Sequence, residues 1–227
     1  MRKQGIFITG TGTDVGKTYV TALLIKQLRQ LGIDVGYYKA AISGSGSIEE
    51  SDAGYVNKIA NIGQEQTTLL SYLYQTAVSP HLAAKLEGNP VELEKIKEDF
   101  QTVKNQYEYV VMEGSGGIVC PIRYDNTKQF LLEDIIKELN LDTVVVANAG
   151  LGTINSTVLT VEYLRQKKIS IQGIFLNFYT GSEMEEDNKK MIEALTGVPI
   201  LATIRENMNQ IKLNKKAIKQ LLGGDYV

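Results

Sequence analysis

The sequence predicts an α/β fold in which a single parallel sheet is covered by helices on both faces. Short runs rich in β-branched and aromatic residues alternate with stretches of helical periodicity, which is the pattern of successive strand–helix–strand units. The runs at 109–112 and 143–147 are apolar throughout, as expected for central strands buried on both faces. A chain of 227 residues fits one domain, 1–227, because two domains would each be small.

The elements follow one another along the chain as this fold requires. We expect strands at 6–8, 35–38, 109–112, 143–147, 171–176 and 199–202. We expect helices at about 17–31, 51–62, 92–106, 131–140, 154–167, 184–196 and 214–222. The glycines and serines of 43–47 predict a mobile loop at the active site. Ligands of open α/β sheets bind beyond the carboxyl ends of the strands, so the residues after each strand are the candidates for chemistry.

The composition narrows the function classes. A net charge of −2 without a basic block gives no electrostatic reason to expect nucleic acid or a membrane surface as partner. No apolar run is long enough to span a bilayer, and the first strand begins too close to Met1 to leave room for a signal peptide. A single cysteine, Cys120, and a single histidine, His81, exclude an internal disulfide and a zinc cluster. We therefore expect a cytoplasmic protein.

A glycine-rich segment joins the first strand to the first helix: Gly10, Thr11, Gly12, Thr13, Asp14, Val15, Gly16, Lys17 and Thr18. Strand, loop and helix in this order indicate a P-loop, whose backbone amides surround phosphates. Lys17 would reach the terminal phosphates and the Thr18 hydroxyl a Mg²⁺ ion. The usual G-x-x-x-x-G-K-[ST] spacing would put the first glycine at position 11, so this loop is a variant with five intervening residues. ATP with Mg²⁺ is the predicted ligand, and the fold is of the P-loop NTPase type.

Three charged residues lie near other expected strand ends. Lys39 follows the second strand and is either a solvated charge or a second cation for the phosphates. Asp52 fits a helix amino terminus, where the dipole favours an acid, or a metal ligand. Glu113 ends the run 109–112 and precedes a glycine-rich turn, the place of an acid that holds the metal of a nucleotide.

Two later segments admit both a structural and a functional interpretation. Gly150–Thr157 places glycines and small polar residues before a helix, as either an anion site or ordinary capping. Asn177 follows a strand and either reads a base edge or forms a turn. His81 is expected to be a satisfied structural residue at a helix start, and Cys120 a buried, inert thiol.

No serine–histidine or cysteine–histidine arrangement is present, so the substrate itself would supply the nucleophile. Phosphoryl transfer needs mainly positioning and charge stabilisation from the protein. Lys17 and Lys39 could neutralise a migrating phosphoryl group while Thr18, Asp52 and Glu113 hold the metal. An acid is the natural acceptor.

The order and spacing of these motifs resemble the dethiobiotin synthetase family over roughly residues 5 to 177. The motifs are Thr9 to Thr18, Tyr38-Lys39 with Ser43-Gly44, Ser51-Asp52-Ala53, Ser79-Pro80-His81, Glu113 to Gly117, Leu151 to Asn155 with Leu159-Thr160, and Asn177. The resemblance implies ring closure of 7,8-diaminononanoate with CO₂ and ATP, a late step of biotin synthesis. A carbamate on one amine would attack the γ-phosphate, and the second amine would displace phosphate from the mixed anhydride.

The resemblance also implies roles for individual residues and a homodimer. Lys39 would be catalytic together with Lys17, and Ser43 would contact the diamine. Gly152, Thr153, Ile154 and Asn155 would bind the substrate carboxylate from the partner subunit. The nucleotide contacts would be Gly12, Thr13, Asp14, Val15, Gly16, Lys17, Thr18, Tyr19, Asp52, Glu113, Gly114, Ser115, Gly116, Asn177, Arg205, Glu206 and Asn207. At 204–207 this chain has Ile-Arg-Glu-Asn where the family often has an isoleucine–proline pair.

A nucleotide-switched partitioning ATPase of the same fold is the alternative. Those proteins typically carry an extra lysine early in the phosphate loop, where this chain has Thr11-Gly12-Thr13. The sequence therefore favours the synthetase.

Overall fold

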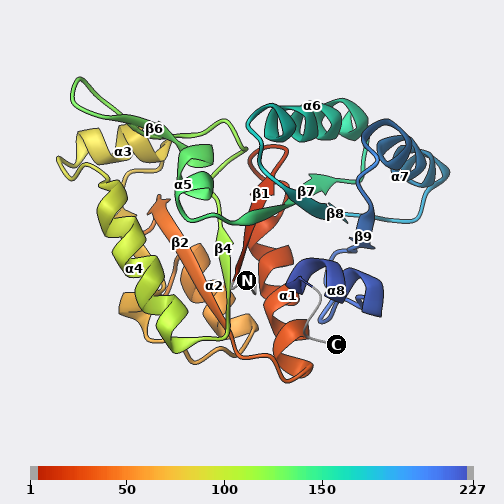
Figure 1. Cartoon of the computed structure of the whole chain (residues 1–227), viewed down its shortest axis with the longest axis horizontal. Helices are drawn as coiled ribbons and strands as arrows, with labels where there is room; N and C mark the ends of the chain where they lie inside the picture. Colours follow the sequence, from red (N-terminus) through yellow and green to blue (C-terminus); the bar gives the residue numbers. More distant parts are fainter. Residues whose placement is uncertain (1–4, 224–227) are drawn as a thin grey trace.

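The computed structural model describes residues 5–223 and has a seven-stranded sheet at its centre (Figure 1). The order of the strands is β3-β2-β4-β1-β7-β8-β9, and every neighbouring pair is parallel. These strands are β1 (Gly5–Gly10), β2 (Val35–Ser43), β3 (Leu70–Tyr74), β4 (Tyr109–Glu113), β7 (Asp142–Asn148), β8 (Ile171–Asn177) and β9 (Ile200–Thr203). The predicted fold class is confirmed.

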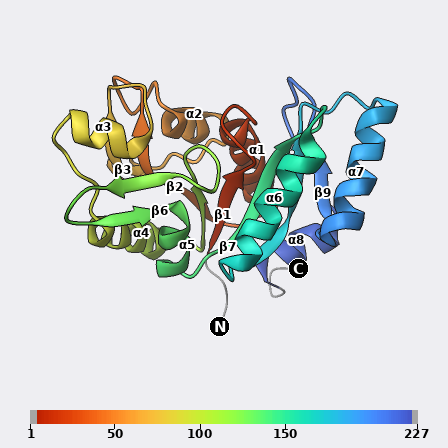
Figure 2. The same cartoon turned by 90° about the horizontal axis from the view of Figure 1, so that it is seen from above.

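Helices cover both faces of the sheet. They are α1 (Lys17–Gln30), α2 (Asp52–Ile59), α3 (Pro80–Leu86), α4 (Leu93–Gln106), α5 (Leu132–Glu138), α6 (Thr153–Gln166), α7 (Glu183–Thr196) and α8 (Lys215–Leu222), with a 3₁₀ turn η1 (Gln66–Thr68). Figure 1 shows α6 and α7 on one side of the sheet and α1 and α8 on the other, and Figure 2 shows the same layers from above. Within residues 5–223, none of these helices is both long and apolar enough to cross a membrane.

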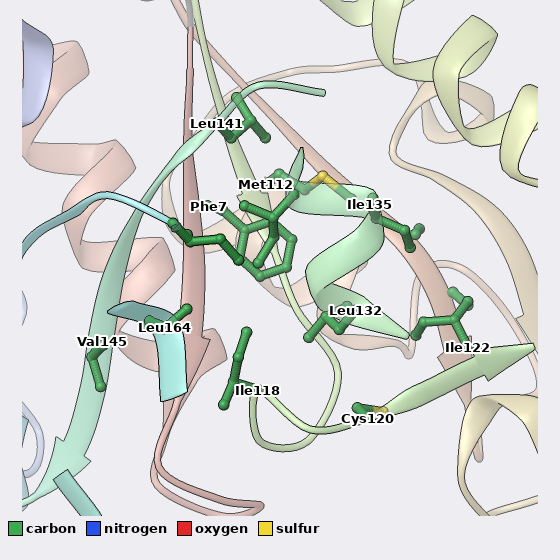
Figure 3. Close-up of a cluster of buried hydrophobic side chains, with 14 of the residues drawn as sticks. Phe7, Met112, Ile118, Cys120, Ile122, Leu132, Ile135, Leu141, Val145 and Leu164 are labelled. Atoms are coloured by element: carbon green, nitrogen blue, oxygen red, sulfur yellow. The ribbon is translucent and has the colours of Figure 1, made fainter. Parts of the chain in front are cut away.

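Alternation along the strands divides the core into two layers. Phe7 and Met112 pack with residues of α4 to α7, whereas Ile6, Ile8 and Val111 pack with α1, α2 and α8. Successive side chains of a strand point to opposite faces, so a strand covered on both faces is apolar at every position. Figure 3 shows part of the first layer, where Phe7 and Met112 meet Leu132 and Ile135 of α5.

Several elements were not predicted. The edge strand β3 is short and only alternately buried, and the antiparallel hairpin of β5 (Pro121–Tyr124) and β6 (Gln129–Leu131) has just three or four residues a strand. Such short segments carry little periodicity. The helix α3 was anticipated only as a helix start at His81.

One expected strand boundary was wrong in a way that matters for the site. Strand β2 continues to Ser43, so Lys39 lies inside the strand rather than after it. The extension arises because β3 and β4 both pair with this part of β2, with Lys39 opposite Leu70 and Glu113. Lys39 therefore has a fixed backbone in the sheet, not a loop position.

Candidate active site

The phosphate loop lies between β1 and α1 and is closed on itself. The backbone amide of Thr11 donates to Val146 O of β7 at 3.0 Å, which ties the loop to the neighbouring strand. Lys17 curls back so that its Nζ donates to Gly12 O at 3.0 Å. A Cβ on Gly10 would lie 2.8 Å from Val15 Cγ2 and 3.1 Å from Lys17 Cδ. The early glycine of this variant therefore makes room for the side chains that fold over the loop.

Asn177 supports the other end of the loop. Its Nδ2 donates to Val15 O at 3.0 Å, and its side chain is fully buried at the end of β8. Gly16 has φ of 80°, and a Cβ there would lie 2.1 Å from Asn177 Nδ2, so a side chain is excluded at this position. The buried Oδ1 of Asn177 has no hydrogen-bond partner among residues 5–223. The structure thus places Asn177 against the phosphate loop with one acceptor to spare.

Four predicted residues from four elements meet beside the loop. Lys39 of β2 donates from Nζ to Asp52 Oδ2 at 2.6 Å and to Glu113 Oε1 at 2.8 Å. Thr18, at the start of α1, donates from Oγ1 to the same Glu113 oxygen at 2.7 Å. Glu113 and Lys39 are 1% and 4% exposed, whereas Asp52 keeps about half of its side chain in solvent. A buried cation, a buried carboxylate and an accessible carboxylate therefore form one connected cluster, which we call the Lys39 cluster.

Asp52 lies at a helix amino end, as one of the two interpretations expects, while its role as a metal ligand stays a prediction. It is the first residue of α2, whose amino end is capped by the Ser51 hydroxyl accepting from Gly54 N. Its carboxylate also points to Lys39. Helix dipole and cluster charge act on the same group.

The charges of this cluster shift the pKa values of its members. Burial disfavours the ammonium of Lys39, but the charges of Glu113 and Asp52 outweigh burial and raise its pKa. Burial, followed by the charge of Lys39, lowers the pKa of Lys17. For Asp52, burial acts upward, yet Lys39 and the hydrogen bonds from Lys39 and Thr18 hold the pKa below its usual value. Lys39 therefore holds its proton more firmly than Lys17 does.

A cavity of about 460 Å³ extends from the phosphate loop to the end of β2. Its lining includes Thr13, Ser43, Ser115 and Gly116 of the predicted set, together with Gly117 and Cys120. The Ser43 hydroxyl donates to Val78 O at 2.6 Å. A ligand between Ser43 and the phosphate loop would therefore lie in one continuous cavity.

Cys120 fits the expected inert thiol. Burial raises the pKa of Cys120 to about 11, so the thiol stays protonated at neutral pH although it lines the cavity. His81 lies in the first turn of α3 as expected, but its buried Nδ1 has no hydrogen-bond partner among residues 5–223. The expectation that His81 is fully satisfied is therefore wrong.

The predicted base-binding segment is exposed and held from α1. Arg205, Glu206 and Asn207 are all exposed after β9. The Tyr19 hydroxyl donates to Met208 O at 2.7 Å and lies 3.3 Å from Arg205 O. Tyr19, near the start of α1, therefore holds this loop through two of its backbone carbonyls.

The amino end of α6 is built differently from the Lys39 cluster. Gly152 is its left-handed N-cap residue with φ of 87°, and no side chain caps this end. Leu151, just before the helix, is 92% exposed, and Leu159, within the helix, is 62% exposed. A cavity of about 620 Å³ runs from Thr11 and Gly117 to Asn155 and Leu159. The structure leaves this predicted carboxylate site open, with apolar side chains in solvent beside it.

Sequence reasoning missed Tyr37. The Tyr37 hydroxyl donates to Glu113 Oε2 at 3.2 Å, and the side chain is fully buried. The available signal was strand alternation, since Tyr37 lies two residues before Lys39 and so on the same face of β2.

The oxygen donors of the Lys39 cluster fit a magnesium ion bound together with phosphates. Within residues 5–223 no group of three or more His, Cys, Asp and Glu side chains could hold a metal by itself. Thr18, Asp52 and Glu113 offer one hydroxyl and two carboxylates next to the phosphate loop. Mg²⁺ is usually held by one or two carboxylates together with phosphate and water oxygens, and Asp52 and Glu113 fit the protein's part of that donor set.

Comparison with solved structures supports the fold. The chain is similar to a ParA family ATPase from Chlorobium tepidum, with a TM-score of 0.55 and 14% identity over 99% of this chain and 91% of that one. It is also similar to the septum site-determining protein MinD of Pyrococcus horikoshii, with a TM-score of 0.55 and 17% identity over 98% and 88% of the two chains. At this identity the likeness shows a shared P-loop NTPase-type architecture and nothing more.

Sequence comparisons are more specific. A family model described as an AAA domain matches residues 4–212. The ATP-dependent dethiobiotin synthetase BioD of Brachyspira hyodysenteriae is 50% identical over 96% of this chain and 98% of its own length. The proteins of the same name from Clostridium botulinum strain Langeland and Clostridium novyi are 49% and 44% identical, over 92% and 97% of this chain and 94% and 99% of their own lengths. The chain is therefore an enzyme of the ATP-dependent dethiobiotin synthetase family.

Proposed function

We propose that this chain is a homodimeric, Mg²⁺-dependent dethiobiotin synthetase that uses ATP to close a cyclic urea on 7,8-diaminononanoate with CO₂. The observation that carries the proposal is the Lys39 cluster. A buried, firmly charged lysine is paired with Asp52 and Glu113, and Glu113 also accepts from Thr18 at the end of the phosphate loop. Lys39 lies on the same strand as Ser43, which lines a cavity that reaches the phosphate loop at Thr13. Neither His81 nor Cys120 belongs to this cluster, so the nucleophile would come from the substrate.

The proposed reaction has three steps. One substrate amine adds to the carbon of CO₂ and loses a proton, which gives a carbamate. A carbamate oxygen then attacks the γ-phosphorus of ATP, and ADP leaves. The second amine attacks the carbamoyl carbon, and phosphate leaves as the urea ring closes. Each step needs anionic oxygens held near cations, and preorganised positive charge is worth far more in a buried site than in water.

The residues of this chain take distinct parts in that reaction. Lys17 would hold the terminal phosphates of the nucleotide. Lys39 would hold the carbamate and the migrating phosphoryl group together, because its backbone lies inside a buried strand and its ammonium is held by Asp52 and Glu113. Thr18, Asp52 and Glu113 would hold Mg²⁺, which when bound neutralises phosphate charge. Ser43 would position the diamine in the cavity beside Cys120.

The far end of the substrate would lie at the amino end of α6. A helix amino terminus favours a carboxylate through its free amides and its dipole. This end has no side-chain cap, and Leu151 and Leu159 are exposed beside it. We therefore propose that Gly152 to Asn155 of one subunit complete the substrate site of the other. The cavity that joins Asn155 to Thr11 and Gly117 supports a site at this surface.

The partitioning ATPase alternative is not favoured. Its support is the shared fold at 14–17% identity, whereas the relatives named dethiobiotin synthetase are 44–50% identical over nearly the whole chain.

Mass spectrometry of a single reaction tests the proposal. Purified protein is mixed with ATP, MgCl₂, bicarbonate and 7,8-diaminononanoate, and the expected product is dethiobiotin with one ADP and one phosphate for each molecule formed. Omission of bicarbonate should abolish the product, and ¹³C-bicarbonate should label the urea carbon. Folded protein that binds ATP but yields no dethiobiotin would refute the proposed reaction.

A further inference from the structure

We propose that Tyr37 is a positioning residue that fixes the orientation of the Glu113 carboxylate and thereby sets the affinity of the site for its divalent cation. The inference rests on the proposed function, because it assigns Glu113 to the metal. It adds a residue of strand β2 that does not touch the reacting groups.

The two oxygens of Glu113 have separate partners. Oε1 accepts from Thr18 Oγ1 at 2.7 Å and from Lys39 Nζ at 2.8 Å. Oε2 accepts from the Tyr37 hydroxyl at 3.2 Å. The glutamate is 1% exposed, so water cannot readily replace a lost donor. Tyr37 thus holds the back of the carboxylate while the other oxygen faces the cluster.

Tyr37 is itself clamped by the side chain of Gln64. The Tyr37 amide donates to Gln64 Oε1 at 2.9 Å, and Gln64 Nε2 donates to Tyr37 O at 2.9 Å. Asn57 in turn holds the backbone of Gln64. Its Nδ2 donates to Gln64 O at 2.9 Å, and its Oδ1 accepts from Gln64 N at 3.0 Å. Asn57 lies on α2, the helix that begins at Asp52. The hydrogen-bonded network therefore links the Glu113 carboxylate, through Tyr37 and Gln64, to the helix whose first residue is Asp52.

Loss of the hydroxyl would leave a buried charged oxygen without its donor. An orphaned buried acceptor is costly, and a carboxylate that ligates a metal depends on its outer hydrogen bonds for orientation. Phenylalanine preserves the ring and its packing, so the change removes the donor with little loss of volume. The adjacent Tyr38 offers a matched control. Its hydroxyl bonds to Ser71 and lies 3.3 Å from Ile96 O on the opposite face of β2, away from Glu113.

Direct metal binding tests the inference without the diamine. Mn²⁺ is titrated into protein saturated with ADP, and free Mn²⁺ is read by electron paramagnetic resonance for wild type, Tyr37→Phe and Tyr38→Phe. Tyr37→Phe should weaken Mn²⁺ binding by about tenfold, at the low end of the effect of outer-shell partners. Binding of ADP in EDTA should be unchanged. Tyr38→Phe should lower the melting temperature and leave Mn²⁺ affinity as in wild type.

Two outcomes would overturn the inference: wild-type Mn²⁺ affinity in Tyr37→Phe, or equal weakening in both variants. If Tyr37→Phe does not fold, Gln64→Met is used in its place, since it releases the clamp and should weaken Mn²⁺ binding several-fold while ADP binding in EDTA persists. Wild-type Mn²⁺ affinity in that variant would count against the network. Because no diamine is present, failure of dethiobiotin synthesis would not affect this result.

Discussion

The Lys39 cluster and the amino end of α6 are both predicted parts of one site, but they are built differently. In the cluster the charged groups are paired within the chain, since Lys39 lies against Asp52 and Glu113, and Thr18 donates a hydrogen bond to Glu113. At α6 no side chain caps the helix, and Leu151 and Leu159 lie in solvent. A self-contained region can be assembled by folding alone. An open, apolar-edged region needs something else to complete it, and a second subunit is our proposal.

The largest expected effect comes from a substitution in the Lys39 cluster, the self-contained region. Lys39→Ala removes the cation between two carboxylates, and by analogy with lost oxyanion donors turnover should fall by about 10²–10³-fold. The phosphate loop, with Lys17 on Gly12 O, should stay intact, so ATP affinity should change little. Steady-state kinetics and isothermal titration calorimetry measure the two quantities. Full activity in this variant would remove Lys39 from its proposed role.

The next largest effect comes from a substitution on α6, in the open region. Leu159→Asp places a charge in the apolar surface beside Asn155, and a central interface residue worth about 2 kcal/mol raises a dimer dissociation constant about 30-fold. Sedimentation velocity should show dissociation, and the KM for the diamine should rise while ATP binding is retained. Leu86→Asp is the matched control, because Leu86 is also 62% exposed but lies on α3. If Leu159→Asp leaves both the dimer and KM unchanged, α6 is not the interface.

Within the Lys39 cluster and its surroundings, the sequence predicted some residues better than others. Thr18 and Glu113 were found because a P-loop and an acid at the end of an apolar strand are local patterns. Lys39 was placed after its strand, although pairing with β3 and β4 keeps it inside β2. That pairing is a tertiary effect, and no local pattern reports it. Tyr37 escaped notice although alternation puts it on the same face as Lys39, because its role depends on Glu113, 76 positions away.

The role of Asn177 remained open at the level of the sequence because its contact joins two segments that are far apart in the chain. The sequence offered a base contact or a turn, and the structure shows a bond from Nδ2 to Val15 O across 162 positions. The short β5–β6 hairpin and the edge strand β3 were missed because a few half-buried residues have no clear period. Apart from the carboxyl end of β2, the central strands and the long amphipathic helices were predicted to within a few residues.

The smallest expected effect concerns two residues that lie opposite each other on neighbouring strands of the sheet. Asn177 on β8 and Asn148 on β7 lie opposite each other, yet they serve different regions. Asn177 donates to Val15 O of the phosphate loop, whereas Asn148 Oδ1 accepts from Gly150 N ahead of α6 at 2.7 Å. Asn177→Ala leaves the buried Val15 carbonyl without that donor, a loss of about 1–3 kcal/mol in general. We expect ATP affinity to fall about tenfold, since 1.4 kcal/mol corresponds to a factor of ten.

Asn148→Ala should give the complementary result, with ATP affinity unchanged and a higher KM for 7,8-diaminononanoate. Calorimetric titration of ATP and steady-state kinetics in the diamine distinguish the two. Because the residues are neighbours of the same type at the same sheet edge, a general loosening of that edge would affect both variants alike. Equal losses of ATP affinity would therefore show that the two regions are not independent, and the division between a self-contained phosphate site and an open substrate site would have to be abandoned.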